Sequence, residues 1–244
     1  MHNANAPVPH PAPTLEAAGA RAIRGAADGR VYSAIYEAIV DHRLPPGTAL
    51  PEDTLSAAFG FSRTVIRKAL QRLAHDHLVD QRPNRGACVA RPSLEEARDV
   101  FAAREVVERA TVAAAACAAR PADLARLQRN LEAGAAALAR GDRRAHIRLS
   151  GEFHLLIAEI GGNRALAGFV GQLAARSSLI LALYEIPGRT PCAEEDHAAL
   201  LGALAAHDEP RAQALMSAHL ATLARDIGGT EEAPIDLHAL FAQR

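Results

Sequence analysis

The sequence predicts a mainly α-helical protein: an N-terminal winged helix-turn-helix with a small β-wing, then a C-terminal antiparallel bundle of six or seven helices. Three observations predict this class. Aromatic residues make up only 4% of the 244 residues while alanine is abundant, which favours helix over strand. A helical pattern with basic residues on its polar face is followed by a short basic turn. Beyond residue 93, amphipathic segments follow one another with short breaks, as in an antiparallel bundle.

The composition divides the chain into four segments. Residues 1–25 are rich in Pro, Ala and Asn and are expected to be a disordered tail. Residues 26–92 are predicted to form the winged helix-turn-helix, 93–228 a helical domain, and 229–244 a C-terminal tail.

We expect a cytoplasmic protein with no membrane partner. The N-terminus lacks a basic stretch followed by an apolar run, so it does not resemble a signal peptide. No stretch approaches the roughly 18 apolar residues that a membrane helix requires. The three cysteines are odd in number and widely spaced, which fits a reducing compartment better than a disulfide framework.

The first helix is predicted over residues 28–42, with Val31, Ile35 and Ile39 on its inward face. Two prolines after Leu44 end it, because proline cannot continue the hydrogen-bond ladder. A short extended piece reaches Leu50, and a second helix runs from about Pro51 through Phe59, since proline suits a first helical turn.

The third helix carries the most informative pattern. Ser62 is expected to cap it. An apolar stripe then recurs at helical spacing through Ile66, Ala69, Leu70 and Leu73. Arg63, Arg67 and Gln71 project together from the opposite face. A buried side with a row of guanidinium and amide groups opposite is what a helix in the major groove of DNA needs.

The wing is predicted from the residues 82–86, Arg-Pro-Asn-Arg-Gly, which lie between two short apolar segments. Residues 62–91 hold seven Arg and Lys against two acidic residues, whereas residues 93–244 hold 16 against 20. Basic charge is thus confined to the part that would face a polyanion. The predicted DNA-binding residues are Arg63, Thr64, Arg67, Lys68, Asn84, Arg85 and Gly86.

Every segment after residue 92 is helical in pattern. Ser93 stands three positions before Glu96, which indicates a capping box. The predicted helices span residues 93–119, 121–140, 142–160, 163–185, 191–206 and 208–227.

Polar residues interrupt the apolar stripes of three of these helices. Ser150 and His154 fall within the apolar arc of one, His197 leads the stripe of another, and His219 lies within that of a third. Buried imidazoles need partners. Each could be a hydrogen-bonded core residue, or the three could hold a divalent transition metal (Zn, Ni, Mn or Fe).

Arg104 also lies on an inward stripe, where a guanidinium needs an anion. Two partners are open: a buried carboxylate such as Glu108, or the carboxylate of a bound effector. We therefore expect Arg104 and Ser150 to be effector-binding residues.

Leu55 through Val89 resembles the DNA-binding domain of GntR-family bacterial transcription regulators, on the segments FGFSRTVIRKAL, LVDQRPNRGACV and LPPGTAL. The rest resembles the FadR-type effector domain, known as FCD, on EFHLLIAEIGGN, EEDHAALLGALAAHD and ALMSAHLATL. Together the resemblances cover roughly residues 28–226.

This resemblance implies that His154, His197 and His219 are metal ligands. Ser150 stands where metal-binding members usually have Asp, so either metal affinity would be lower, or water or effector would fill that position. The alternative is a polar pocket in which the three histidines hydrogen-bond an anionic effector directly.

Together these features predict a ligand-responsive transcription regulator, not an enzyme. We expect a repressor that binds a double-stranded DNA operator as a homodimer, because one recognition helix offers few contacts. Its effector is expected to be a small carboxylic acid. One alternative is a metal-dependent helical enzyme, although no carboxylate is evident on the stripes beside the three histidines. The other is an effector-independent DNA-binding protein, which would need no polar pocket.

Overall fold

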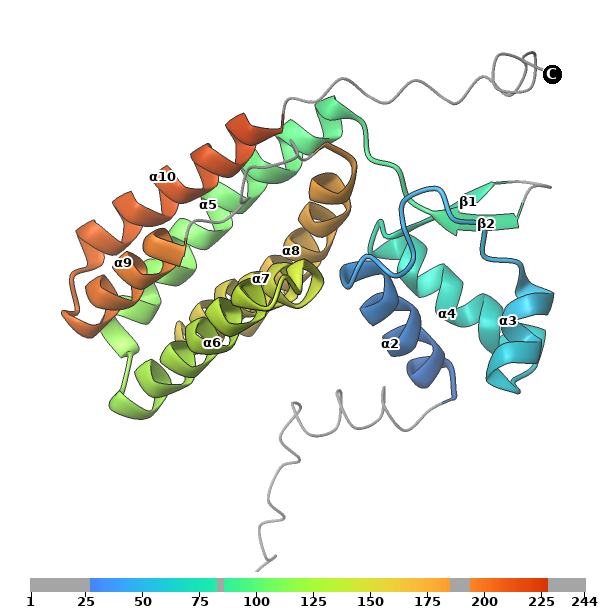
Figure 1. Ribbon diagram of the computed structural model, residues 1–244, viewed down its shortest axis with the longest axis horizontal. Helices are drawn as coiled ribbons and strands as arrows, with labels where there is room; N and C mark the ends of the chain where they lie inside the picture. Colours follow the sequence, from blue (N-terminus) through green and yellow to red (C-terminus); the bar gives the residue numbers. More distant parts are fainter. Residues whose placement is uncertain (1–26, 83–85, 185–193, 228–244) are drawn as a thin grey trace, which may run out of the picture.

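The computed structural model describes residues 27–82, 86–184 and 194–227. Two parts lie side by side in it (Figure 1): three helices with a β-hairpin, and a bundle of longer helices. This confirms the predicted mainly helical class with a small wing. The predicted tails at 1–25 and 229–244 lie outside the described residues.

The smaller part consists of α2 (Ala27–Val40), α3 (Glu52–Phe59) and α4 (Arg63–His75). Its core is formed by the stripes that the sequence predicted on the first and third of these helices, including Val31, Ile35, Ile66 and Leu73. The predicted cap of α4 is wrong in one respect. Ser62 holds the N-cap position, but its hydroxyl makes no capping hydrogen bond.

The wing is an antiparallel pair, β1 (Val79–Arg82) and β2 (Gly86–Val89), with Val79 opposite Val89. The extended piece before α3 lies along the other edge of β2. Gly47 N–H donates to the Val89 carbonyl at 2.9 Å, and Leu50 N–H donates to the Ala87 carbonyl at 2.8 Å. Strand β2 is therefore hydrogen-bonded along both of its edges.

The larger part holds six described helices: α5 (Leu94–Ala118), α6 (Pro121–Ala139), α7 (Arg143–Ile160), α8 (Arg164–Tyr184), α9 (Glu194–Ala205) and α10 (Glu209–Asp226). Each begins and ends within three residues of its predicted span. The capping box at the start of α5 is confirmed by Ser93 and Glu96, which bond each other's backbone N–H. Gly161 ends α7 where an added Cβ would lie 2.8 Å from the Thr111 carbonyl, so only glycine fits this crossing of α5.

Helix α8 is long and apolar enough to cross a membrane by length and composition, so the expectation that no stretch approaches this limit is wrong. The same test is met by core helices of water-soluble proteins. Here α8 packs against α5 and α7, and its Ala175 and Leu179 belong to the core beneath α2 and α4. We interpret it as the helix that joins the two parts.

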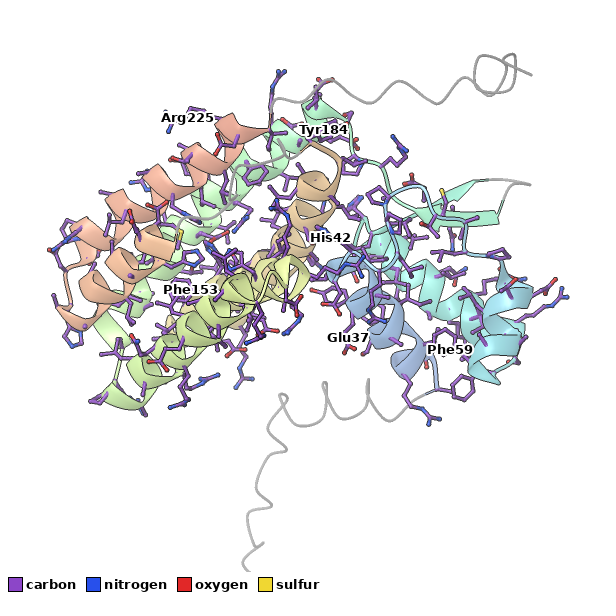
Figure 2. All side chains as sticks on the ribbon, viewed as in Figure 1. Glu37, His42, Phe59, Phe153, Tyr184 and Arg225 are labelled. Atoms are coloured by element: carbon purple, nitrogen blue, oxygen red, sulfur yellow. The ribbon has the colours of Figure 1, made fainter. Side chains whose placement is uncertain are left out.

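Polar contacts fix the two parts to each other. His42 lies at their boundary (Figure 2), where its Nε2 is 3.0 Å from the Ser178 carbonyl and 2.9 Å from the Ser178 hydroxyl. Asp76 accepts hydrogen bonds from Tyr32 of α2 at 2.6 Å and Gln172 of α8 at 3.2 Å. A displacement of α8 would therefore move α2 as well.

Candidate metal centre and DNA-binding surface

The polar face of α4 lies on the surface, as a DNA-contacting helix requires. Arg63 and Arg67 keep 65% and 57% of their side chains exposed, and each pairs with an acid of α3. Arg67 donates to Glu52 at 2.6 and 2.8 Å, and the pKa of Glu52 is lowered by this hydrogen bond. Arg63 pairs with Asp53. Exposed ion pairs are weak, so phosphates or base edges can replace these carboxylates.

The structure describes three of the other five predicted DNA-binding residues: Thr64, Lys68 and Gly86. Thr64 and Lys68 are exposed on α4. Gly86 opens β2 with a φ of 76°, a left-handed conformation that disfavours a side chain. Asn84 and Arg85 lie outside the described residues.

The three predicted histidines meet inside the bundle. His154 of α7, His197 of α9 and His219 of α10 are each at most 4% exposed, and their candidate ligand atoms all lie within 4.8 Å of one another. The Nε2 atoms of His154 and His197 are 3.3 Å apart. Phe153 is fully buried and stacks on the His197 ring at 4.4 Å between centroids.

Two carboxylates hold the outer nitrogens of this cluster. Glu108 of α5 lies 2.5 Å from Nδ1 of His154, and Asp196 of α9 lies 3.1 Å from Nδ1 of His219. A carboxylate at Nδ1 leaves the Nε2 lone pair for a metal, the usual arrangement around protein metal ions. The expectation that no carboxylate lies beside these histidines is therefore wrong. Glu108 was predicted only as a partner of Arg104, and Asp196 was not predicted, because neither lies one turn from a histidine on its own helix.

Burial also favours the form of imidazole that binds metals. It lowers the pKa of His219 to about 4, with His154 as the next cause, and lowers the pKa of His197 as well. Metal ligation requires the neutral ring. The lowered pKa values of His197 and His219, and the carboxylates at the outer nitrogens of His154 and His219, thus fit a divalent transition ion.

Arg104 pairs with Glu108, the first of the two partners that the sequence left open. Its Nε donates to Glu108 at 2.6 Å, and the two side chains are 4% and 1% exposed. Burial alone would raise the pKa of Glu108, but Arg104 and His154 outweigh it and lower the pKa to about 2. Glu108 therefore stays charged and links Arg104 to the histidine cluster.

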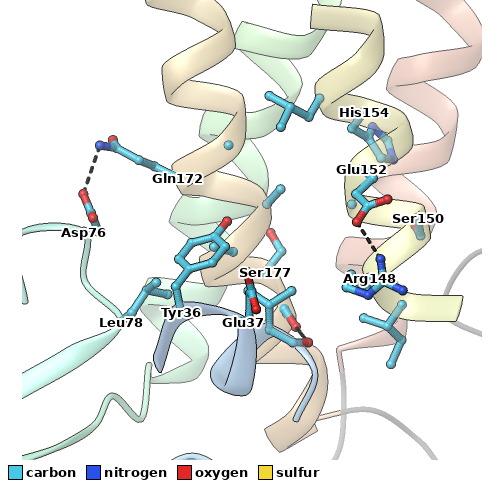
Figure 3. A pocket seen from close by; sticks show the side chains of 18 of the residues that line it. Tyr36, Glu37, Asp76, Leu78, Arg148, Ser150, Glu152, His154, Gln172 and Ser177 are labelled. Carbon is cyan, nitrogen blue, oxygen red and sulfur yellow. Dashed lines mark hydrogen bonds and ion pairs between the residues drawn. The ribbon is translucent and has the colours of Figure 1, made fainter. Parts of the chain in front are cut away.

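A cavity of about 700 Å³ leads from this cluster to the DNA-binding part (Figure 3). Arg104, Ser150 and His154 line one end. Tyr36 and Glu37 of α2 line the other. The predicted effector-binding residues are thus brought together with the metal candidates. That α2 forms the opposite wall could not be predicted from any one segment.

A fourth buried histidine, His146, was not predicted. It lies on α7 four residues before Ser150 and eight before His154, so the three share one face. The helical spacing that identified Ser150 in the sequence could also have identified His146. His146 lines the large cavity and a second cavity of about 230 Å³, which His197 and Ser150 also line.

Comparisons with known proteins agree with both halves of this architecture. The family described as bacterial regulatory proteins, gntR family, matches residues 28–89, and the FCD domain matches residues 99–222. The HTH-type transcriptional repressor RspR of Escherichia coli K12 is 30% identical over 131 residues, which are 54% of this chain and 58% of that protein. The match thus spans little more than half the length of that curated relative. Fatty acid metabolism regulator proteins of E. coli and Yersinia enterocolitica are 54% identical over 43 residues, 17% of this chain and 18% of theirs.

Solved structures extend the likeness over more of the chain. E. coli McbR/YncC superposes with a TM-score of 0.72 at 25% identity, covering 80% of this chain and 94% of that one. A putative GntR regulator of Rhodococcus sp. RHA1 gives 0.73 at 26% identity, covering 82% and 96%. The matching families are regulators rather than enzymes, which agrees with the prediction that this chain is not an enzyme.

Proposed function

Since the chain belongs to the GntR family of bacterial regulatory proteins and carries an FCD domain, we propose that it is a cytoplasmic transcription regulator. It binds a double-stranded operator through α4 and the wing, and it responds to a small carboxylic acid bound in the helical domain. The observation that carries the proposal is the cavity, because His154 of the histidine cluster lines one end and α2 of the DNA-binding part lines the other.

On DNA, Arg63, Thr64 and Arg67 would reach base edges. Lys68 and the wing residues Asn84, Arg85 and Gly86 would contact the backbone. A homodimer would place two α4 helices on the half-sites of a palindrome and double the contacts. We expect the operator-bound form to repress.

In the bundle, His154, His197 and His219 would hold one divalent ion through Nε2. When bound, the ion supplies positive charge and vacant coordination positions. Ser150, at the position where related domains usually have Asp, contributes no charge. Glu108 already neutralises Arg104. The bound ion, more than Arg104, would therefore require an anionic ligand. A carboxylate oxygen would supply that ligand, with Arg104 and Ser150 in the adjacent cavity wall.

Coupling between the two sites follows from the shared wall. A ligand that fills the cavity contacts α2 and α8, which the bonds of His42 and Asp76 tie together. It can change operator affinity only if it fits one arrangement of the two parts better than the other. A DNA-binding protein without an effector would have no use for this cavity.

The test begins with duplexes selected from a random pool by the full chain. We expect a palindromic sequence, a dimer in native mass spectrometry, and one transition metal ion per protomer in elemental analysis. Failure to enrich any sequence would overturn the DNA-binding proposal. A protein that carries no metal, and whose melting temperature no divalent ion raises, would overturn the metal site.

A further inference from the structure

A metal ion at the histidine cluster would lie deep in the bundle and would need a route to solvent. His154, His197 and His219 are each at most 4% exposed. A site of this kind can exchange its ion only through an opening between helices. Two cavities in the described part of the chain reach the cluster. His154 lines the first, of about 700 Å³, and His197 lines the second, of about 230 Å³.

The second cavity opens to solvent between α6, α7 and α9. Helix α6 packs against both of the others. Exposed residues of α6 and α9 line the cavity, among them Glu132, Ala135 and Ala198, while the buried His197 lies at its inner end. Since a water molecule occupies about 30 Å³ in the liquid, this space can hold an ion with part of its hydration shell. The cavity therefore joins the cluster to the surface without passing the DNA-binding part.

The side chains of this second cavity suit a divalent cation. Glu132 supplies a carboxylate, Gln128 an amide and Ser150 a hydroxyl, and none of the described residues that line it is Arg or Lys. Oxygen atoms of these kinds can replace water around a divalent ion. Gln128 donates to Glu132 at 2.9 Å, and both are exposed on α6, so the two side chains lie together at the mouth.

The first cavity is less suited to ion exchange because of the ligand that we place in it. Arg104 and Arg148 line it together with His154. Each guanidinium is paired with a carboxylate, Arg104 with Glu108 and Arg148 with Glu152, so charge alone does not exclude a cation there. Position does, because the proposed carboxylic acid would lie between the ion and this opening. With the acid bound, only the second cavity remains open.

We propose that the divalent ion enters and leaves the cluster through the second cavity, between α6 and α9, and that the first cavity serves the effector alone. The inference rests on the proposed metal site and adds the route that serves it. A barrier in the route slows the entry and the exit of the ion equally, so it changes the rates of exchange and leaves the affinity unchanged. A residue that supports the site itself would instead change the affinity.

The experiment narrows each cavity and measures zinc exchange in the full chain. Ala135→Phe on α6 and Ala198→Phe on α9 each add an apolar ring that is buried best over the second opening. Zinc-loaded protein is mixed with a saturating chromogenic chelator, which reports the rate of zinc dissociation, and the affinity is measured by competition with the same chelator. We expect each variant to release zinc roughly tenfold more slowly, equal to about 1.4 kcal/mol on the barrier, with unchanged affinity.

Ala167→Phe is the matched control. Ala167 is half-buried on α8 and lines the first cavity but not the second. The same increase in size at this position should leave both the rate of zinc release and the zinc affinity at their wild-type values.

The possible failures separate the route from the metal site. If wild type binds zinc but both second-cavity variants release it at the wild-type rate, the route is wrong and the metal site stands. The route is equally wrong if Ala167→Phe is the variant that slows release. Faster release with weaker affinity in both second-cavity variants would show that these residues support the site rather than line a route, which also overturns the inference. If wild type binds no zinc, the metal site and the route are both wrong.

Discussion

Replacing Glu108 with Gln should destabilise the helical bundle more than any other single amide substitution on α5. The carboxylate uses one oxygen for Arg104 and the other for His154, at 2.6 and 2.5 Å. Glutamine has a single acceptor oxygen, so one donor loses its partner and Arg104 becomes a buried cation without a counter-charge. Breaking a buried ion pair in this way costs about 3–5 kcal/mol. For a chain of this size that corresponds to a fall in melting temperature of about 6–20 °C.

Thermal and urea denaturation of the metal-free protein measure this cost, with Glu105→Gln as the control. Glu105 is half-buried on the same helix and changes in the same chemical way. If Glu108→Gln melts at the same temperature as the control, the bonds of Glu108 to Arg104 and His154 do not stabilise the bundle.

The pKa of Glu108 provides an independent check of the same reasoning. It lies near 2 in the folded protein, against 4.5 for a free side chain. Its contribution is therefore complete above about pH 4.5 and is lost as the pH falls toward 2, a loss of roughly 3 kcal/mol. The acid limb of the stability curve should be shallower in Glu108→Gln. An unchanged acid limb would mean that another group dominates acid unfolding.

Three further predictions concern DNA and metal. Arg63→Ala or Arg67→Ala should weaken binding to the selected operator by ~1–3 kcal/mol in fluorescence anisotropy, with the fold unchanged; equal loss on random duplexes would make them phosphate contacts only. Ser150→Asp should tighten the metal site in a competition with a chelator, because it adds a charged oxygen ligand one turn before His154; no change would place Ser150 outside the coordination sphere. Chelation should lower the melting temperature, and zinc at about 100 times its dissociation constant should restore roughly 2.7 kcal/mol; an unaffected melting temperature would argue against an ion in this site.

Helices were predictable from the sequence because their signals are local. Apolar periodicity, prolines and glycines placed all six bundle helices within three residues of their ends. The same periodicity placed His154, His197 and His219 inward, and the resemblance to FadR-type domains grouped them.

Contacts between helices were not predictable in this way. The link from Glu108 to His154 joins α5 to α7, and Asp196 reaches His219 from α9 to α10. The role of α2 as a cavity wall depends on how the two parts pack. His146 shows the reverse case: its spacing from Ser150 was visible in the sequence, but its unpaired Nε2 appears only in the structure.

One measurement tests the central claim that a ligand in the shared cavity controls DNA binding. Operator affinity is measured with and without the organic acid that most raises the melting temperature of the metal-loaded protein. We predict a change of roughly 5–150-fold, the usual range of coupling between two sites, and its loss in His154→Ala. An acid that stabilises the protein but leaves operator affinity unchanged would contradict the account.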